Sequence, residues 1–227
     1  MASELILVRH GQTAWNLAGR LQGHRDSPLT DLGRRQARDQ GERLAPLAPG
    51  LLVASPLGRA RHTARLIAGR LAVPVEHDAA LRERGMGILE GLSWEEIAVE
   101  HPAEQARRRA DPWGWRPPGG ESFEDLRRRT APLLDRLVDR PVERIVVVSH
   151  SALARPLLGA LLGFDEFTML DLEVPNDVAY RVRLATPPAV SRLDERGEHA
   201  GVLTGALRRT LDYDPRTGAE EGSAERR

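Results

Sequence analysis

The stretch "ELILVRHG" (residues 4–11) decides the fold of this chain. Its apolar residues 5–8 follow one another without alternation, which is typical of a strand buried on both faces of a parallel sheet. The run ends at Arg9 and His10, and Gly11 follows them. We expect this strand to deliver an arginine and a histidine to its carboxyl end, where α/β proteins place their ligands. The glycine is expected to let the backbone turn and approach a ligand closely.

Further apolar runs repeat this arrangement along the chain. They predict strands at residues 51–55, 73–81, 144–150 and 177–184. Helical spacing of apolar residues predicts helices at 31–44, 58–71, 93–109, 123–138 and directly after residue 150. Strands that alternate with helices favour an α/β fold with a mainly parallel central sheet sandwiched by helices.

The predicted elements form one α/β domain over residues 1–187, with a cap insertion of helix and loop at about residues 93–122. The composition changes from residue 188 onward, so residues 188–227 are expected to be a C-terminal extension. Leu203, Leu207 and Leu211 predict an amphipathic helix in this extension, and its polar end is predicted to be disordered. The extension is expected to pack on the core or on a partner subunit, which makes a homodimer one expected assembly.

The composition of the 227 residues excludes several classes of function. Lysine plus arginine and aspartate plus glutamate both number 33, and a dedicated nucleic-acid binder usually shows a basic excess instead. No apolar run approaches the ~20 residues of a membrane span, and no secretion signal is found, so a cytoplasmic location is expected. The absence of cysteine excludes thiolate chemistry, and the absence of lysine excludes Schiff bases and a P-loop.

Charged side chains follow four of the predicted strands. Arg9 and His10 follow the first strand, and Arg59 stands at the start of the helix after the second. Glu83 follows the third strand, and His150 follows the fourth. Because the carboxyl ends of parallel strands meet at one edge of a sheet, we expect these five side chains to converge.

Two histidines, two arginines and a carboxylate are the groups that phosphoryl transfer requires. A neutral imidazole can accept a phosphoryl group, and arginine supplies paired donors for the charge that spreads over the phosphoryl oxygens. A carboxylic acid can give the leaving alcohol its proton. The remaining histidines show no metal-ligand spacing, so no metal site is predicted. The partner that this set indicates is a small phosphorylated substrate.

Five motifs in order carry a family resemblance: LVRHGQTAWN, SPLGRARHTA, LRERGMGILEG, PPGGES and VVVSHSALARPLLGALLG. Over residues 4–184 the chain resembles the histidine phosphatase superfamily, the phosphoglycerate-mutase-like group in its larger branch. The resemblance implies the fold of that family. It also implies a phosphomonoesterase of the histidine acid phosphatase type, which needs no metal or cofactor and hydrolyses a small phosphorylated metabolite through phosphohistidine.

The resemblance implies a role for each matching residue. His10 would accept the phosphoryl group, and Glu83 would be the proton donor. Arg9, Arg59 and His150 would complete the phosphate pocket. Four further positions are implied to contact phosphate or substrate: Asn16, Gln22, Gly23 and Ser151. The family usually has glycine at the last of these four positions.

Three other functions compete with hydrolysis. A phosphoglycerate mutase would hand the phosphate back, but the family's mutases resemble one another in a longer, lysine- and arginine-rich segment after the acid motif. The corresponding segment here is shorter and contains no lysine. A phospho-ligand binding protein without catalysis is disfavoured because nucleophile and acid are both present. A serine-hydrolase elbow at Ser149 or Ser151 lacks the flanking glycines that its strained turn needs.

The cap region is expected to choose the substrate. Its tryptophans at 94, 113 and 115 either stack on a sugar, base or apolar group or simply pack the cap. The arginines at 107–109 and 116 either meet a second anionic group or form a solvated face. Glu121 and Ser122 either contact the substrate near Glu83 or cap the helix that follows.

Overall fold

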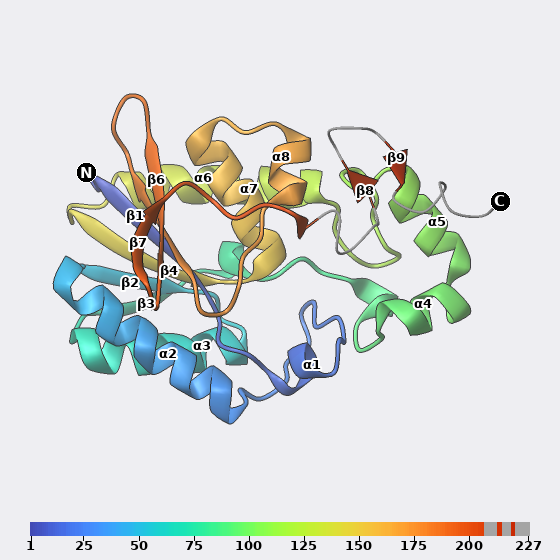
Figure 1. Ribbon diagram of the computed structural model, residues 1–227, viewed down its shortest axis with the longest axis horizontal. Coiled ribbons are helices and arrows are strands. Elements are labelled where there is room, and N and C mark those ends of the chain that lie inside the picture. The colour runs from blue at the N-terminus through green and yellow to red at the C-terminus, as the bar shows by residue number, and fades with distance from the viewer. Residues whose placement is uncertain (207–212, 215–218, 221–227) are drawn as a thin grey trace.

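β1 (Glu4–Arg9) is an inner strand of a seven-stranded sheet whose order is β3-β2-β4-β1-β5-β6-β7 (Figure 1). The computed structural model describes residues 1–206, 213–214 and 219–220. The other strands of the sheet are β2 (Leu51–Ala54), β3 (Val75–His77), β4 (Arg144–Ser149), β5 (Ala179–Arg183), β6 (Ala189–Asp194) and β7 (Gly197–Ala200). A separate pair is formed by β8 (Tyr213–Asp214) and β9 (Ala219–Glu220).

The α-helices of the described residues cover the two faces of this sheet or lie beside it. They are α1 (Ala14–Leu17), α2 (Asp31–Leu44), α3 (Gly58–Leu71), α4 (Trp94–Glu100), α5 (Pro102–Ala110), α6 (Phe123–Val138), α7 (Ser151–Leu162) and α8 (Glu166–Asp171). The helices predicted at 31–44, 58–71 and 123–138 are confirmed. Thr30 and Ser122 cap α2 and α6, because each side chain accepts a hydrogen bond from a backbone N–H of the first turn.

The sheet is parallel over β3, β2, β4 and β1, and antiparallel over β5, β6 and β7. The predicted central sheet sandwiched by helices is confirmed. Its mixed character begins at the antiparallel pair of β1 and β5 and continues through β6 and β7, whose short connections only antiparallel strands allow. Val8 lies opposite Val148 and Arg9 opposite Ser149 in the register of β1 and β4. The residues after these two strands, His10 and His150, are therefore neighbours.

Each face of the sheet has its own hydrophobic core. The odd-numbered side chains of β1, β2 and β4 pack with α6, α7 and α8 on one face. The even-numbered side chains pack with α2 and α3 on the other face. In Figure 1, α2 and α3 lie below the sheet, and α6, α7 and α8 lie above it. Burial on both faces explains the unbroken apolar runs of these strands. It also makes their carboxyl ends rigid supports for the residues that follow.

The cap is a smaller layer beside the sheet, with α4 and α5 at its outer side (Figure 1). It packs on a core of its own, formed by Met86, Leu89, Ile97 and Trp115. The single helix predicted at 93–109 is wrong, because the chain breaks between α4 and α5 at His101. Proline at the first position of α5 removes a backbone donor and holds the preceding residue out of the helical region.

The sheet continues beyond the predicted domain boundary after residue 187. β6 and β7, which lie in the predicted extension, pair antiparallel with β5 and with each other. The predicted helix through Leu203 does not begin there, since residues 201–205 are not helical. Leu207, Leu211 and most of the end predicted to be disordered lie outside the described residues. No described helix combines the length and apolar character needed to span a bilayer.

Candidate active site

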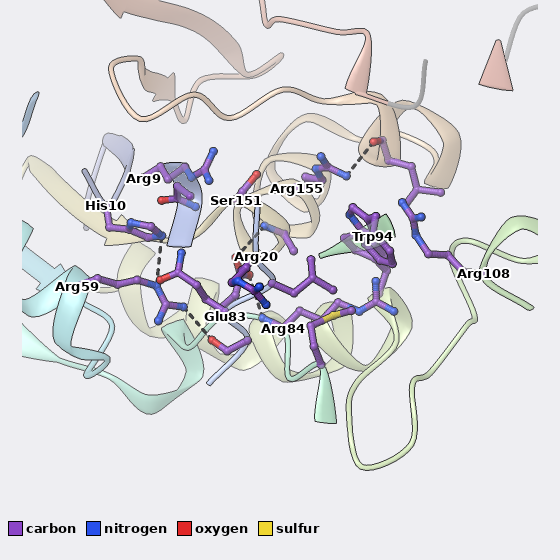
Figure 2. Close-up of a pocket in the computed structure, with 18 of the residues that line it drawn as sticks. Arg9, His10, Arg20, Arg59, Glu83, Arg84, Trp94, Arg108, Ser151 and Arg155 are labelled. Atoms are coloured by element: carbon purple, nitrogen blue, oxygen red, sulfur yellow. Dashed lines mark hydrogen bonds between the residues drawn. The ribbon is translucent and has the colours of Figure 1, made fainter. Parts of the chain in front are cut away.

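A cavity of about 340 Å³ lies where the parallel strands end, between the sheet and the cap (Figure 2). This volume is in the range of sites for small molecules. Eight of the predicted site residues line it: Arg9, His10, Asn16, Gln22, Gly23, Arg59, Glu83 and Ser151. His150 is fully buried, and the centroid of its ring is 5.2 Å from that of His10. The structure thus brings together all the predicted site residues.

His10 is held in one orientation by hydrogen bonds to its ring and to its backbone carbonyl. Its Nδ1 is 2.9 Å from the carbonyl oxygen of Gly11, and Asn176 Nδ2 donates to the carbonyl of His10 at 2.6 Å. The carbonyl of Gly11 fixes the proton on Nδ1, so Nε2 carries the lone pair and accepts from Arg59 Nε at 3.3 Å. Burial, with the charges of Arg9 and Arg59, holds the pKa of His10 well below its usual range. His10 is therefore a neutral imidazole with a nucleophilic Nε2.

Arg59 is fixed at the start of α3 by a loop from another part of the chain. Its Nη1 donates to Asp26 Oδ1 at 2.8 Å and to the carbonyl of Arg25 at 2.7 Å. Its Nη2 donates to the carbonyl of Gly23 at 2.8 Å. Asp26 also accepts from the backbone N–H groups of Gly58 and Arg59, at 2.6 and 3.2 Å. One carboxylate thus holds both the helix N-terminus and the guanidinium, with Nε directed to His10.

Arg9 and His150 leave buried polar atoms unsatisfied. Arg9 Nη1 donates to the carbonyl of Val174 at 2.8 Å, but its Nε has no hydrogen-bond partner among the described residues. His150 Nε2 lies 2.8 Å from Ser55 Oγ, while its Nδ1 likewise has no described partner. Burial and the charge of Arg59 hold the pKa of His150 well below its usual range. Buried polar atoms of this kind are what an anionic ligand can satisfy.

Glu83 is seated at the N-terminus of α7. Its carboxylate accepts from the backbone N–H of Leu153 at 3.2 Å and of Ala152 at 3.4 Å. It also accepts from the N–H of Arg84 at 2.9 Å. Free N–H groups and the helix dipole at this end favour a negative charge. The carboxylate is therefore held in place at the cavity, which Glu83 lines together with Arg59 (Figure 2).

The remaining predicted contacts come from loops and from the first turn of α7. Asn16 is part of the capping box of α1 with Thr13, and it also lines the cavity. Gln22 is buried, and its Oε1 has no hydrogen-bond partner among the described residues. Ser151 is the first residue of α7 and presents its hydroxyl group at the cavity wall. All three can add donors or acceptors around a bound anion.

Two glycines of the site are required by close packing. A Cβ at Gly11 would lie 2.2 Å from the carbonyl oxygen of Gly33, so this position lets the end of β1 pack directly on α2. Space beside α2 thus requires a glycine at this position, whether or not the backbone also approaches a ligand closely as predicted. Gly23 has φ +50°, and a Cβ there would lie 2.1 Å from the carboxylate of Glu90.

The cap residues divide between packing and the cavity. Trp94 and Arg108 line the cavity, with the Arg108 guanidinium 3.6 Å from the Trp94 ring centroid. Trp113 stacks on Phe123 with ring centroids 5.7 Å apart, and Trp115 is buried in the cap core. The interpretation of Trp113 and Trp115 as stacking surfaces for a ligand is therefore wrong, because Trp115 is covered by the cap core and Trp113 by Phe123 and the main core.

Most of the other polar residues singled out in the cap have structural partners. Arg107 pairs with Glu104, and Arg116 pairs with Asp125. Glu121 accepts from the N–H of Gly85 and pairs with Arg129. Ser122 caps α6, as the simpler of its two interpretations predicted. Arg109 is exposed.

Several residues that support the site were missed from the sequence. Asp26 holds Arg59, Ser55 bonds His150, and Asn176 bonds the backbone of His10. Thr63 accepts from the N–H of Gly11 at 3.1 Å. Each partner is distant in the sequence, so no local spacing could have indicated these contacts. Among the described residues, no group of three or more His, Cys, Asp or Glu side chains is arranged to hold a metal ion.

The family model and the most similar relatives found by comparison with known proteins agree on one family. The sequence model of the histidine phosphatase superfamily (branch 1) matches residues 5–188. A glucosyl-3-phosphoglycerate phosphatase of Mycolicibacterium vanbaalenii is 40% identical over 170 residues, which are 70% of this chain and 74% of the relative. A Yersinia pestis protein named "Probable phosphoglycerate mutase GpmB" is 34% identical over 186 residues, 82% of this chain and 86% of the relative.

A solved structure agrees with these relatives. A mycobacterial glucosyl-3-phosphoglycerate phosphatase in complex with VO3 superposes with a TM-score of 0.75 at 31% sequence identity. The match covers 90% of this chain and all of that one. The predicted family and the predicted sheet-and-helix architecture are therefore confirmed.

Proposed function

The chain belongs to branch 1 of the histidine phosphatase superfamily, and from this we propose that His10 is the nucleophile of a phosphatase acting on small phosphorylated metabolites. The geometry of His10 is the observation that carries the proposal. Its Nδ1 is bonded to the carbonyl of Gly11, its Nε2 is free of a proton, and two arginines stand beside it. A neutral nitrogen nucleophile within a positively charged pocket suits attack on a phosphate monoester.

The first step transfers the phosphoryl group to the enzyme. Arg9, Arg59 and His150 bind the phosphate, for which Arg59 exchanges its bond with His10 Nε2 for bonds to phosphate oxygens. His10 Nε2 forms the new N–P bond while the ester P–O bond breaks. Glu83 enters this step as the carboxylic acid and gives its proton to the leaving oxygen, so that an alcohol departs, and the N-terminus of α7 stabilises the carboxylate that remains.

The second step regenerates the enzyme. Water enters the place of the alcohol, and Glu83 accepts its proton. The water oxygen attacks phosphorus, the N–P bond breaks, and inorganic phosphate leaves. His10 returns to the neutral state that the carbonyl of Gly11 favours. Asn16, Gln22 and Ser151 complete the ring of polar groups around the phosphate, which is supported by their position on the cavity wall.

Phosphoenzyme trapping tests this function. A ³²P-labelled aryl phosphate quenched within milliseconds should leave an acid-labile, alkali-stable label on the wild-type chain. His10→Asn should abolish the label and lower kcat by about 10³-fold or more, as expected for loss of a covalent nucleophile. His77→Asn, which changes an exposed histidine, serves as the matched control. It should keep both the label and the wild-type kcat. Turnover and labelling that survive His10→Asn would refute the assignment.

Product analysis distinguishes hydrolysis from a mutase reaction, in which the phosphoryl group is returned to the substrate. Incubation with 3-phosphoglycerate should release inorganic phosphate, whereas a mutase would accumulate 2-phosphoglycerate. The named activity of the mycobacterial relatives makes glucosyl-3-phosphoglycerate the first metabolite to compare with it. Net formation of 2-phosphoglycerate without phosphate release would favour the mutase instead.

A further inference from the structure

Ser55 carries a buried hydroxyl group that the proposed reaction does not use. It directly follows β2, and its backbone N–H donates to the carbonyl of Val148 in β4 at 3.0 Å. β2 and β4 are parallel neighbours whose register pairs Ala54 with Val148. Ser55 therefore stands beside the end of β4, which His150 follows, and both residues are completely buried.

The hydroxyl group of Ser55 has two hydrogen-bonding neighbours among the described residues. The backbone N–H of Leu57 donates to its oxygen, with 3.3 Å between the two atoms. His150 Nε2 lies 2.8 Å from the same oxygen. Because Leu57 contributes only a donor, the hydroxyl proton of Ser55 has one acceptor within this set, the ring nitrogen of His150.

The hydroxyl proton of Ser55 decides between the two neutral forms of His150. Burial, with the charges of Arg59 and Arg9, holds the pKa of His150 well below its usual range, so the ring is neutral near pH 7. A proton on Nε2 would be donated to Ser55, and the buried hydroxyl group would then lack an acceptor for its own proton. With the proton on Nδ1 instead, Nε2 accepts from the hydroxyl group and both are satisfied.

The Nδ1 atom of His150 is left for a ligand. It is buried and makes no hydrogen bond to any described residue. The ring of His150 lies beside that of His10, and its neighbouring positive charges are those of the phosphate pocket, Arg59 and Arg9. A buried N–H without an acceptor costs free energy, and an oxygen of a phosphate bound at His10 would supply the acceptor.

We propose that Ser55 is a positioning residue that sets the tautomer of His150, so that this histidine binds the substrate phosphate as a neutral N–H donor through Nδ1. The inference rests on the proposed phosphatase function, and it adds a role for a residue that does not itself line the cavity.

The same tautomer gives the two buried histidines opposite roles. In His10 the Nδ1 proton is bonded to the carbonyl of Gly11, and the Nε2 lone pair is left to attack phosphorus. In His150 the Nε2 lone pair is engaged by Ser55, so this ring has no free lone pair with which to attack. Ser55 thus keeps His150 a donor beside a nucleophile of the same residue type.

NMR spectroscopy of the full-length protein near neutral pH observes the tautomer directly. Long-range ¹H–¹⁵N correlation distinguishes a protonated ring nitrogen from an unprotonated one, and the spectrum of His150→Gln identifies the signals of this ring. We expect Nδ1 of His150 to be protonated and Nε2 to be unprotonated in the wild type. A proton on Nε2, alone or together with one on Nδ1, would overturn the proposal.

Ser55→Ala tests what the tautomer contributes to phosphate binding. The variant should lower kcat/KM about 3- to 10-fold and weaken inhibition by inorganic phosphate by a similar factor, as expected for loss of one hydrogen bond. Ser55→Cys, which keeps a weak donor of similar size, should lie between this variant and the wild type. Wild-type values of both quantities in Ser55→Ala would contradict the proposed role.

Ser149→Ala is the matched control for the tautomer. It removes a buried hydroxyl group at the end of the neighbouring strand, and that group donates to the carbonyl of Leu81 rather than to a histidine. The ring signals of His150 should therefore show the same tautomer as in the wild type. A change of tautomer in this variant as large as in Ser55→Ala would count against a specific effect of Ser55.

A double-mutant cycle determines whether Ser55 acts through His150. In a His150→Gln background, Ser55→Ala should cause no further loss of kcat/KM, because no imidazole remains to be oriented. An equal loss in both backgrounds would make the contribution of Ser55 purely structural and would overturn the proposal. Should Ser55→Ala not fold, the tautomer of His150 in the wild type still decides it.

Turnover of a simple ester separates the role of Ser55 from the phosphatase function. If the wild type hydrolyses 4-nitrophenyl phosphate but His150 carries its proton on Nε2, the role of Ser55 is wrong and the phosphatase function stands. If a folded wild-type protein hydrolyses no phosphate ester, the proposed function fails, and the donor role of His150 falls with it whatever its tautomer.

Discussion

His10 and His150 are two imidazoles buried within 5.2 Å of each other among arginines. Their pKa values are lowered in the folded protein, first by burial and then by neighbouring positive charge. In the unfolded chain each histidine takes up a proton near pH 6.5. As the pH falls through that value, the unfolded state therefore binds more protons than the native state, and the free energy of unfolding decreases.

This linkage predicts an acid-sensitive fold. Between pH 7.5 and 5.5, the wild type should lose about 1.4 kcal/mol more of its free energy of unfolding than His10→Asn, because the variant lacks one of the two linked protonations. Urea unfolding at the two pH values measures the difference. Equal losses in wild type and variant would show that His10 is not held neutral by the fold.

The residues of the site differ in how far the sequence could predict their positions and contacts. His10, Arg59 and His150 stand directly after buried runs or at helix starts, so their convergence followed from the topology of a parallel sheet. Asp26 and Asn176 lie in loops, and their partners are 33 and 166 residues away in the chain. Those contacts depend on how the loops fold back over the sheet, which no periodicity in the sequence records.

At the scale of elements, β1 and α2 meet through two glycines. Gly11 follows β1 and Gly33 lies in the first turn of α2, and each leaves room only for the backbone of the other segment. This contact places the end of β1, and with it His10, against a helix that begins at Asp31. The nucleophile is thus positioned by backbone-to-backbone packing as well as by hydrogen bonds.

A pair of alanine substitutions tests this packing. Gly11→Ala should destabilise the fold by about 1–3 kcal/mol, since its Cβ would meet a backbone carbonyl that cannot move aside like a side chain. Gly69→Ala, in α3 with open space around the new Cβ, should stabilise the fold by roughly 0.5–1 kcal/mol. Urea midpoints measure both. A Gly11→Ala variant as stable as the wild type would show that the two segments can separate at little cost.

Helix boundaries were predicted well where caps and apolar spacing agree, as in α2, α3 and α6. The cap was harder to predict because polar, helix-forming residues continue across the break between α4 and α5. Pro102 is the one residue that marks the break, because proline disfavours a helical conformation at His101 and suits the first position of a new helix. The direction of β5 could not be read from its sequence either, since the alternation of Arg181, Val182 and Arg183 indicates a strand with one face less covered but does not identify its neighbours.

At the scale of the whole molecule, the sheet extends into the segment that composition assigned to a C-terminal extension. β6 packs Leu193, only 6% exposed, into the same core as Val8 and Ala54. The alternation of buried and half-buried residues in β6 is typical of a strand near the edge of a sheet, with one face covered. Pro187 and Pro188 stand at the predicted boundary, yet the strand after them, β6, has six residues, as many as β1.

Truncation of one side chain tests whether β6 belongs to the domain. Leu193→Ala should lower the free energy of unfolding by roughly 2–4 kcal/mol in a single cooperative transition. Val99→Ala, whose side chain is on the surface of the cap, should change it by less than about 0.5 kcal/mol. A second transition, or an unchanged midpoint for Leu193→Ala, would make β6 and β7 an independent appendage.

The cavity concentrates charge in a chain whose formal net charge is zero. Six arginines and one glutamate line it, so positive charge exceeds negative charge there even though Arg20 and Arg59 are paired with Glu96 and Asp26, and the rest of the chain carries the balancing negative charge. The molecule therefore draws small anions inward by focusing its field in the cavity, while its outer surface repels large polyanions that cannot enter. Capture of substrate should slow as added salt screens that field, although the chain as a whole is electrically neutral.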